Sequence, residues 1–412
     1  MELNQICLSL LELLFQNDGS CTFSHVHDTM QLSKRSLEYQ IEKLNAFLKQ
    51  YRLPEIQCGF GTIQIPVSIQ QQLERILLSD SLLDWYFLSA RERSALLVLL
   101  ILIQKTATTT DALCEQLKVS RNTIVSDLTQ LKKSLPLIGL KLVANHKSGY
   151  KIMGDEITIR LFMLENIHVF YMNAYSQHYI MRFIALLFDE YLSPLRSHQI
   201  SYLLADTFDQ RKETEAHSYT SEARNDILLH IYIMLFRHHA SQIPVYMEEM
   251  KQTGEYHMAE LILSRIYTEQ IPNNAYTSDL YYLTAILLSS NINGTFDISV
   301  VETDVLAFTD KFLRNFEKLT FIHLESRDEL KEKLLLHIRP MYYRLKYGIR
   351  LHNVLNDDIK KDYALYFYLT KKAVKLSINN QDPDLPEDEI AYLCVYLAGW
   401  INQSVSQIEQ EE

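Results

Sequence analysis

The sequence predicts a mainly α-helical protein that is assembled from two kinds of repeated helical unit. Glycine is scarce, at 10 of 412 residues, whereas turn-rich β proteins and enzymes with Gly-rich phosphate loops use far more of it. Two segments with helical spacing of their apolar residues recur along the chain, at offsets of 87 and 107 residues. A chain of this length exceeds one ordinary core, so several helical domains are expected.

The first repeat pairs residues 32–48 with residues 119–135 without a gap. Apolar residues recur in both copies at spacings of four, three and four, which is the stripe of one helix face. Ser33 and Ser120 precede these helices and are suited to cap them. Each capped helix follows two other helical stretches and precedes a hairpin pattern, which is the order of a winged helix-turn-helix. The predicted units span 1–68 and 85–155.

Basic residues gather in the second of these units. The protein as a whole has a net charge of −11, but residues 118–151 hold seven Lys and Arg against one acid, Asp127. A local basic patch on an acidic protein indicates a polyanion as partner. Together with the predicted fold, the patch favours double-stranded DNA, although an ordinary solvated helix face would carry the same charge.

The start of each capped helix is expected to enter the major groove and to present its side chains to base edges. Arginine suits guanine and asparagine suits adenine, whereas lysines outside the groove contact phosphates. The first unit is the weaker candidate, because its helix also carries Glu38 and Glu42. The candidate DNA-binding residues are Lys34, Arg35, Ser36 and Tyr39 in the first unit and Arg121, Asn122, Thr123, Ser126, Lys132 and Lys147 in the second.

The second repeat pairs residues 228–237 with residues 335–344, which share Leu, Leu, His, Ile, Met and Arg in place. Each copy continues with a helical pattern and reaches a related segment, 279–288 in the first copy and 389–398 in the second. Two homologous all-helical domains are therefore predicted. They span 204–301 and 306–406, and a helical linker at 156–203 precedes them.

Two histidines occupy the same position of this repeat. His230 and His337 each follow two leucines, and Arg237 and Arg344 lie seven residues later on the same helix face. A neutral imidazole nitrogen is nucleophilic near neutral pH, and a guanidinium can hold a phosphate through paired hydrogen bonds. The pattern indicates a phosphoryl acceptor with a phosphate-supporting arginine in each domain, and a shared core contact is the alternative.

Several segments of the chain resemble a known family. Residues 119–154 resemble the second helix-turn-helix of sugar-operon activators of the mannitol- and lichenan-regulator type. Residues 335–400 resemble a PTS regulation domain (PRD), and residues 228–290 resemble a more diverged first copy. The resemblance implies a DNA-binding transcriptional regulator of a sugar-utilisation operon, controlled by histidine phosphorylation from the sugar phosphotransferase system.

The resemblance matches His230 and His337 to the first family histidine of each PRD. Ile286 and Tyr396 stand where the family usually has its second histidine. This difference implies one phosphorylation site per domain, or a partial loss of this control. The expected partners are promoter DNA and a phosphotransferase phosphocarrier or sugar-specific component, and the expected assembly is a homodimer.

Other functions fit the sequence less well. The chain has no GxxxxGK[ST], HExxH, paired CxxC or GxSxG motif, and its histidine pairs lack further ligands at metal spacing. We therefore expect neither an enzyme nor a metal or cofactor site. Three alternatives remain. The first is a virulence-type PRD regulator with little or no phosphorylation control. The second is an RNA-binding antiterminator, against which the helix-turn-helix repeats argue, and the third is a pure interaction module that binds neither DNA nor RNA. Few, widely spread cysteines and short apolar runs predict a cytoplasmic protein without a membrane span.

Overall fold

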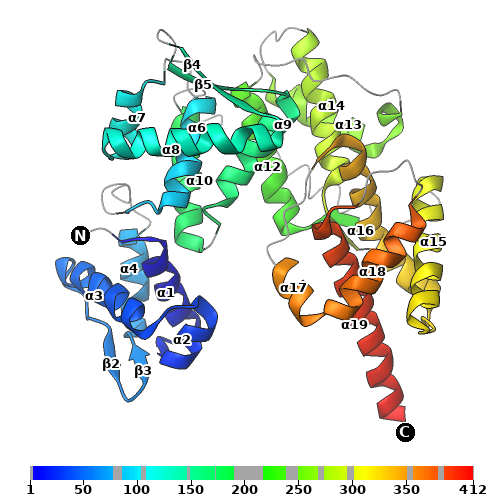
Figure 1. Ribbon diagram of the computed structural model, residues 1–412, viewed down its shortest axis with the longest axis horizontal. Coiled ribbons are helices and arrows are strands. Elements are labelled where there is room, and N and C mark those ends of the chain that lie inside the picture. Colours follow the sequence, from blue (N-terminus) through cyan, green and yellow to red (C-terminus); the bar gives the residue numbers. More distant parts are fainter. Residues whose placement is uncertain are drawn as a thin grey trace. The chain divides into compact units, whose positions relative to one another are not determined.

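The protein divides into two compact units, Met1–Ser197 and His198–Glu412. Helices dominate both units (Figure 1), so the predicted mainly α fold class is confirmed. Within the described residues, no helix has the length and apolar character that crossing a bilayer requires. The structure is a computed structural model, and it describes residues 3–77, 86–103, 108–145, 149–171, 173–189, 217–237, 249–267, 273–294, 301–349, 356–378 and 385–411.

The first part of the N-terminal unit combines helices with a three-stranded antiparallel sheet. Its elements are α1 (Gln5–Gln16), β1 (Ser20–Thr22), α2 (Phe23–Met30), α3 (Lys34–Gln50), β2 (Gln57–Gly59), β3 (Thr62–Gln64) and α4 (Gln70–Leu77). Ser33 begins α3, where its Oγ accepts a hydrogen bond from the Ser36 N–H at 3.2 Å. The predicted hairpin is β2–β3, and β1 pairs with the other edge of β3. The sequence pattern did not predict this short third strand.

The second part of the unit repeats the arrangement of helices and hairpin (Figure 1). Its elements are α6 (Ala90–Ile103), α7 (Thr110–Leu117), α8 (Arg121–Ser134), β4 (Lys141–Asn145) and β5 (Gly149–Met153). Ser120 caps α8 by accepting a hydrogen bond from the Thr123 N–H at 3.3 Å. Arg93 of α6 donates to both carboxylate oxygens of Asp127 at 2.6 and 3.1 Å, and this ion pair fastens α8 to α6.

Two further helices, α9 (Glu156–His168) and α10 (Ala174–Asp189), complete the described N-terminal unit. The first packs against α6 and the second against α1. Just before α10, the side-chain amide of Asn173 donates to the Ser9 hydroxyl at 3.0 Å. The segment predicted as a linker therefore contacts both helix-turn-helix regions, while its last part, 190–203, lies outside the described residues.

The C-terminal unit contains the two copies of the second repeat. The first has β6 (His217–Tyr219), α12 (Ser221–Arg237), α13 (Gly254–Ile266), α14 (Asn273–Ser289) and β7 (Ile292–Gly294), and the second has α15 (Thr303–Thr320), α16 (Arg327–Tyr347), α17 (Asn356–Asp362), α18 (Ala364–Ser377) and α19 (Glu387–Glu411). In each copy the histidine-bearing helix packs against the helix of the related segment, α12 on α14 and α16 on α19. Buried Met250, Tyr281, Ala285 and Leu288 cluster with Tyr343, which joins the copies through α14 and α16.

Candidate functional site

The start of α8 presents the predicted base-reading side chains to solvent. Arg121, Asn122 and Ser126 are exposed, and Thr123 is half-buried because its hydroxyl shares a hydrogen bond with Ser120 Oγ at 2.9 Å. The Arg121 Nη1 atom donates to Asp111 Oδ1 at 2.6 Å. The helix therefore offers an amide, a hydroxyl and a guanidinium side by side, and the guanidinium has an acidic neighbour from α7.

The charge of the exposed α8 surface is cationic because the acid of this helix faces inward. Asp127 is buried against Arg93, so no carboxylate of α8 lies on the exposed side. Five lysines of the predicted basic patch are exposed: Lys118, Lys132, Lys133, Lys141 and Lys151. Lys147 lies outside the described residues.

Val125 is a surface residue of α8 that the sequence reasoning missed. Its side chain is 48% exposed, whereas the neighbouring Ile124 is fully buried. An exposed β-branched residue one turn after Arg121 can contact the methyl group of thymine. The sequence could have indicated this exposure, because Val125 lies outside the apolar stripe of the helix.

The corresponding helix α3 of the first unit has a mixed surface. Lys34 and Arg35 are exposed and Ser36 is half-buried. Tyr39 is 54% exposed, and the Lys43 ammonium lies 5.0 Å from the centre of its ring. The exposed Glu38 and Glu42 share this helix, so the phosphate attraction expected of α3 is weaker than that of α8.

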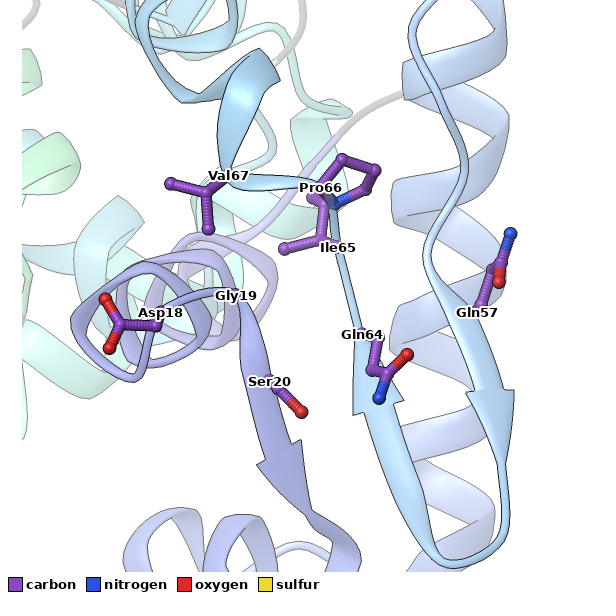
Figure 2. Close-up of a pocket in the computed structure, with 8 residues that line it drawn as sticks. All are labelled: Asp18, Gly19, Ser20, Gln57, Gln64, Ile65, Pro66 and Val67. Carbon is purple, nitrogen blue, oxygen red and sulfur yellow. The ribbon is translucent and has the colours of Figure 1, made fainter.

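A hollow at the base of the first hairpin is lined by the ends of β1, β2 and β3 and by the residues next to them (Figure 2). Gly19 is required at its rim, because a Cβ there would lie 2.3 Å from the Ile65 carbonyl oxygen. The lining contains one carboxylate and no cation, so it does not offer a phosphate-binding site. The lining residues are Asp18, Gly19, Ser20, Gln57, Gln64, Ile65, Pro66 and Val67.

His337, the histidine in the second copy of the C-terminal repeat (228–237 and 335–344), is buried between α16 and α19. Its side chain is 4% exposed, and its Nε2 atom lies 3.4 Å from Glu389 Oε2. The ring stacks on Tyr392, with the ring centres 4.9 Å apart. Burial lowers the pKa of His337 although Glu389 opposes the shift, so the imidazole is neutral and keeps a nucleophilic nitrogen.

Arg344, predicted as the phosphate-supporting residue, already holds a carboxylate. Its Nε and Nη2 atoms donate to Glu389 Oε1 and Oε2 at 2.6 and 2.8 Å. Burial alone would raise the pKa of Glu389, but the charge of Arg344 and the contacts with His337 and Arg344 lower it to about 2. Glu389 is thus an ionised group shared by His337 and Arg344. The sequence reasoning missed this role, although Glu389 and Asp279 occupy matching places in the related segments.

His230, the histidine in the first copy of the C-terminal repeat, has a similar surrounding. It is 5% exposed, and its Nδ1 atom shares a hydrogen bond of 2.8 Å with the Tyr282 hydroxyl. Tyr282 and Tyr392 occupy the same place in the segments 279–288 and 389–398, so each histidine contacts the matched tyrosine. Tyrosine is the aromatic residue that both segments have at a matching position. That match could have identified Tyr282 and Tyr392 as neighbours of the histidines from the sequence. Arg237 is half-buried in the last turn of α12.

Comparisons with known proteins match both units of the chain. The model of the Mga helix-turn-helix domain matches residues 79–166, and the model of the PRD domain matches residues 310–400. The chain is 21% identical over 407 residues to Transcriptional regulator ManR of Bacillus subtilis (strain 168). This alignment covers 95% of this chain and 60% of that protein. It is 23% identical over 418 residues to the Probable licABCH operon regulator of the same organism. This second alignment covers 97% of this chain and 62% of that protein.

The chain spans about three fifths of the length of these two relatives, and both are named as regulators. The Mga match includes α6–α8 and the β4–β5 hairpin, whereas the PRD match includes α16, α18 and the first part of α19. The resemblance to PRD-containing transcriptional regulators of the mannitol and lichenan type is thereby confirmed: the chain carries an Mga helix-turn-helix domain in its N-terminal unit and a PRD domain in its C-terminal unit.

Proposed function

We propose that this protein is a cytoplasmic transcriptional regulator of a sugar-utilisation operon, which binds promoter DNA as a homodimer and responds to histidine phosphorylation by the phosphotransferase system. The observation that carries the DNA-binding part is the exposed face of α8. Arg121, Asn122 and Ser126 stand together there, and the one acid of the helix, Asp127, faces inward. The names of the two relatives support the regulatory role.

In the proposed complex, α8 lies in the major groove. Arg121 leaves Asp111 and binds guanine with two hydrogen bonds, and Asn122 binds adenine in the same way. Lys132 and the other exposed lysines of the patch neutralise phosphates and thereby supply affinity without sequence choice. A dimer would place two such helices on a two-part site.

The regulatory part of the proposal assigns phosphorylation to His230 and His337, with Arg237 and Arg344 as supporting residues. The neutral, nucleophilic state of His337 supports this role. Its burial sets a condition, because a donor protein can reach the ring only after α16 and α19 separate locally. The phosphoryl group would then compete with Glu389 for Arg344.

Footprinting and binding assays on the region upstream of the protein's own gene and of neighbouring sugar genes test the DNA-binding part. Arg121→Ala and Asn122→Ala should each weaken binding by about tenfold to a hundredfold, since a bidentate base contact contributes about 1–3 kcal/mol. Arg314→Ala removes an exposed arginine from α15 and serves as the control. No protected DNA, or equal losses for Arg121→Ala and Arg314→Ala, would refute this part.

Incubation of the full chain with the phosphotransferase proteins and labelled phosphoenolpyruvate tests the regulatory part. An acid-labile label should appear on the wild type, fall in His230→Gln and His337→Gln, and be absent from the double variant. A virulence-type PRD regulator with little or no phosphorylation control is the second candidate, and the burial of both histidines together with Ile286 and Tyr396 in place of the second family histidine supports it. A wild-type chain without label would select that alternative.

A further inference from the structure

One helix of the PRD, α16, binds the first copy of the C-terminal repeat through three basic residues. Arg339 donates to Glu255 of α13 at 3.1 Å, and Lys346 donates to Glu249 at 2.6 Å. The third residue, Arg344, donates to the Ser289 carbonyl oxygen at 2.7 Å, where α14 ends. The two copies of the repeat in the C-terminal unit are therefore joined by specific polar contacts as well as by their apolar cluster.

Arg344 differs from the other two basic residues because it also reaches the histidine site. Its guanidinium holds Glu389 with two hydrogen bonds, and Glu389 lies beside His337. From the same guanidinium, Nη1 donates to the Ser289 carbonyl and, at 3.2 Å, to Asn291 Oδ1. The Arg344 side chain thus connects the surroundings of His337 with the turn after α14 in the first copy of the C-terminal repeat.

That turn supports the beginning of the helix that carries the other histidine. The Asn291 carbonyl oxygen accepts a hydrogen bond from the Thr220 N–H at 3.1 Å. Thr220 in turn caps α12, because its hydroxyl accepts from the Ala223 N–H at 3.1 Å. The strands β6 and β7, on either side of this contact, pair with each other. The helix that begins at this cap carries His230.

We propose that Glu389 and Arg344 couple an anionic group at His337 to the start of α12, so that a modification in the second copy of the C-terminal repeat loosens the first copy. This inference rests on the proposed function for the identity of the anion, a phosphoryl group. In that step a ring nitrogen of His337 forms a bond to phosphorus as the phosphorus–nitrogen bond of the donor's phosphohistidine breaks. One proton passes from the ring of His337 to the imidazole of the donor, so the charge balances.

The coupling follows from the competition of two anions for one guanidinium. A phosphoryl group carries a charge of about −1.5 to −2 near neutral pH, and Glu389 is already ionised beside it. The two anions repel each other in a buried place, where charge interactions are strong. Arg344 moves toward the new anion and gives up the Ser289 carbonyl and Asn291. The turn and the cap of α12 then lose the support that holds them.

Hydrogen exchange of the full chain tests this coupling with a carboxylate as the anion at position 337. The variant His337→Glu should exchange its amides in segments 218–224 and 289–294 about tenfold faster than His337→Gln, which has a similar shape and no charge. Equal exchange in the two variants would overturn the inference. The neutral variant also shows that the position tolerates replacement, which separates the effect of charge from a failure to fold.

A charge relocation provides the sharper comparison. The double variant His337→Glu with Glu389→Gln again leaves a single carboxylate for Arg344, so exchange in both segments should return close to the rate of His337→Gln. Lys346→Gln is the matched control, because it breaks another contact between α16 and the first copy of the C-terminal repeat without touching His337. It should change exchange by less than about twofold. Continued fast exchange in the double variant would show that the effect does not pass through Arg344.

The proposed function is tested separately by the same measurement on the phosphorylated wild-type chain. Labelled chains should show the faster exchange of His337→Glu in segments 218–224 and 289–294. If the chain takes no label, the phosphorylation proposal fails while the two carboxylate variants still decide the coupling. If the chain takes label at His337 and neither segment changes, the coupling fails while the phosphorylation proposal stands.

Discussion

Arg121 and Asp111 form an ion pair of 2.6 Å on the face that we propose for DNA, although their side chains are 67% and 82% exposed. Exposed ion pairs contribute little to stability, so this pair costs little to break. The pair holds the guanidinium on the surface of α7 and α8 and places one carboxylate among the exposed cations. Asp111 therefore acts against DNA binding in two ways: it occupies Arg121 and it repels phosphate.

Asp111→Asn should tighten binding of the full chain to its DNA site by about threefold to tenfold at low salt, because Arg121 is released and a negative charge is removed. The measurement is fluorescence anisotropy with a labelled duplex over a series of salt concentrations. The gain should shrink as the salt concentration rises, since both effects are electrostatic.

Glu115→Gln is the control for the charge alone, because Glu115 is also exposed on α7 and one turn from Asp111. Its removal should tighten binding less than the removal of Asp111 does. Combination of Asp111→Asn with Arg121→Ala should also lose most of the gain. Equal effects of the two acid replacements would contradict a specific role for the ion pair.

Replacement of Arg93 should lower the stability of the N-terminal unit, because Arg93 pairs with Asp127. Both side chains are largely buried, at 14% and 9% exposure, and Asp127 accepts two hydrogen bonds from the guanidinium. Arg93→Ala leaves a carboxylate in a place without its partner, which costs about 3 kcal/mol in such pairs. Chemical denaturation of the N-terminal unit should show this loss, whereas Arg91→Ala, at an exposed position of the same helix, should change it by less than about 0.5 kcal/mol. A similar loss in both variants would argue against the pair.

Local sequence signals were sufficient to predict the fold class and the positions of its hairpins. The caps at Ser33 and Ser120 follow from residue type and from the apolar stripe that comes after them. The strand pattern is interrupted by the glycines beside Phe60 in the first unit and by small and polar residues between β4 and β5 in the second. These features depend on residues close together in the chain, so pattern reasoning reaches them.

The electrostatic partners of the candidate sites could not be predicted in this way. Arg344 and Glu389 are 45 residues apart, and the pair depends on how α16 packs against α19. Spacing alone places Arg344 on the same helix face as His337 and suggests a phosphate-supporting role. It cannot reveal a carboxylate that comes from another helix. The strand β1 was missed for a related reason, because three residues are too few to show a period of two and the strand exists through its pairing with β3.

Stability of the C-terminal unit should fall on mild acidification because of His337. Burial keeps its pKa in the folded chain below the ordinary value of 6.5, so the unfolded chain binds more protons below that pH. The groups facing the ring are Glu389, Arg344, Tyr392 and Tyr396. Glu389, with a pKa of about 2, stays ionised throughout this range. The contribution is complete above the ordinary histidine pKa and is lost as the pH falls below it, by about 1.4 kcal/mol per unit until the folded pKa is reached.

Trp400 of α19 reports the unfolding of this unit in a Trp85→Phe background. Between pH 7.5 and 5.5 the parent should lose about 1 kcal/mol more than His337→Gln does. The two chains differ only at position 337, so the difference isolates His337. A greater loss in His337→Gln than in the parent would mean that the folded chain stabilises the protonated ring and would reverse the assigned direction.

The wing of the second helix-turn-helix depends on a close approach at Gly149. This residue has a φ of +66°, and a Cβ there would lie 2.2 Å from the Thr108 carbonyl oxygen. The same carbonyl accepts a hydrogen bond from the Tyr150 N–H at 3.0 Å, so the hairpin is fastened directly ahead of α7. Gly149→Ala therefore has to displace the hairpin from Thr108 as well as adopt an unfavourable φ.

Gly139→Ala separates these two costs, because Gly139 also has a positive φ, of +77°, but open space around its missing Cβ. Its replacement should cost about 1 kcal/mol, the penalty of the left-handed backbone alone. Gly149→Ala should cost at least about 1 kcal/mol more by chemical denaturation, and it should speed hydrogen exchange of β5 while that of α8 is nearly unchanged. If the two variants lose the same stability and β5 exchanges normally, the contact with Thr108 does not hold the wing. Since the exposed Lys141 and Lys151 lie on this hairpin, a displaced wing should also weaken DNA binding at low salt more than at high salt, which a loss of fold would not do.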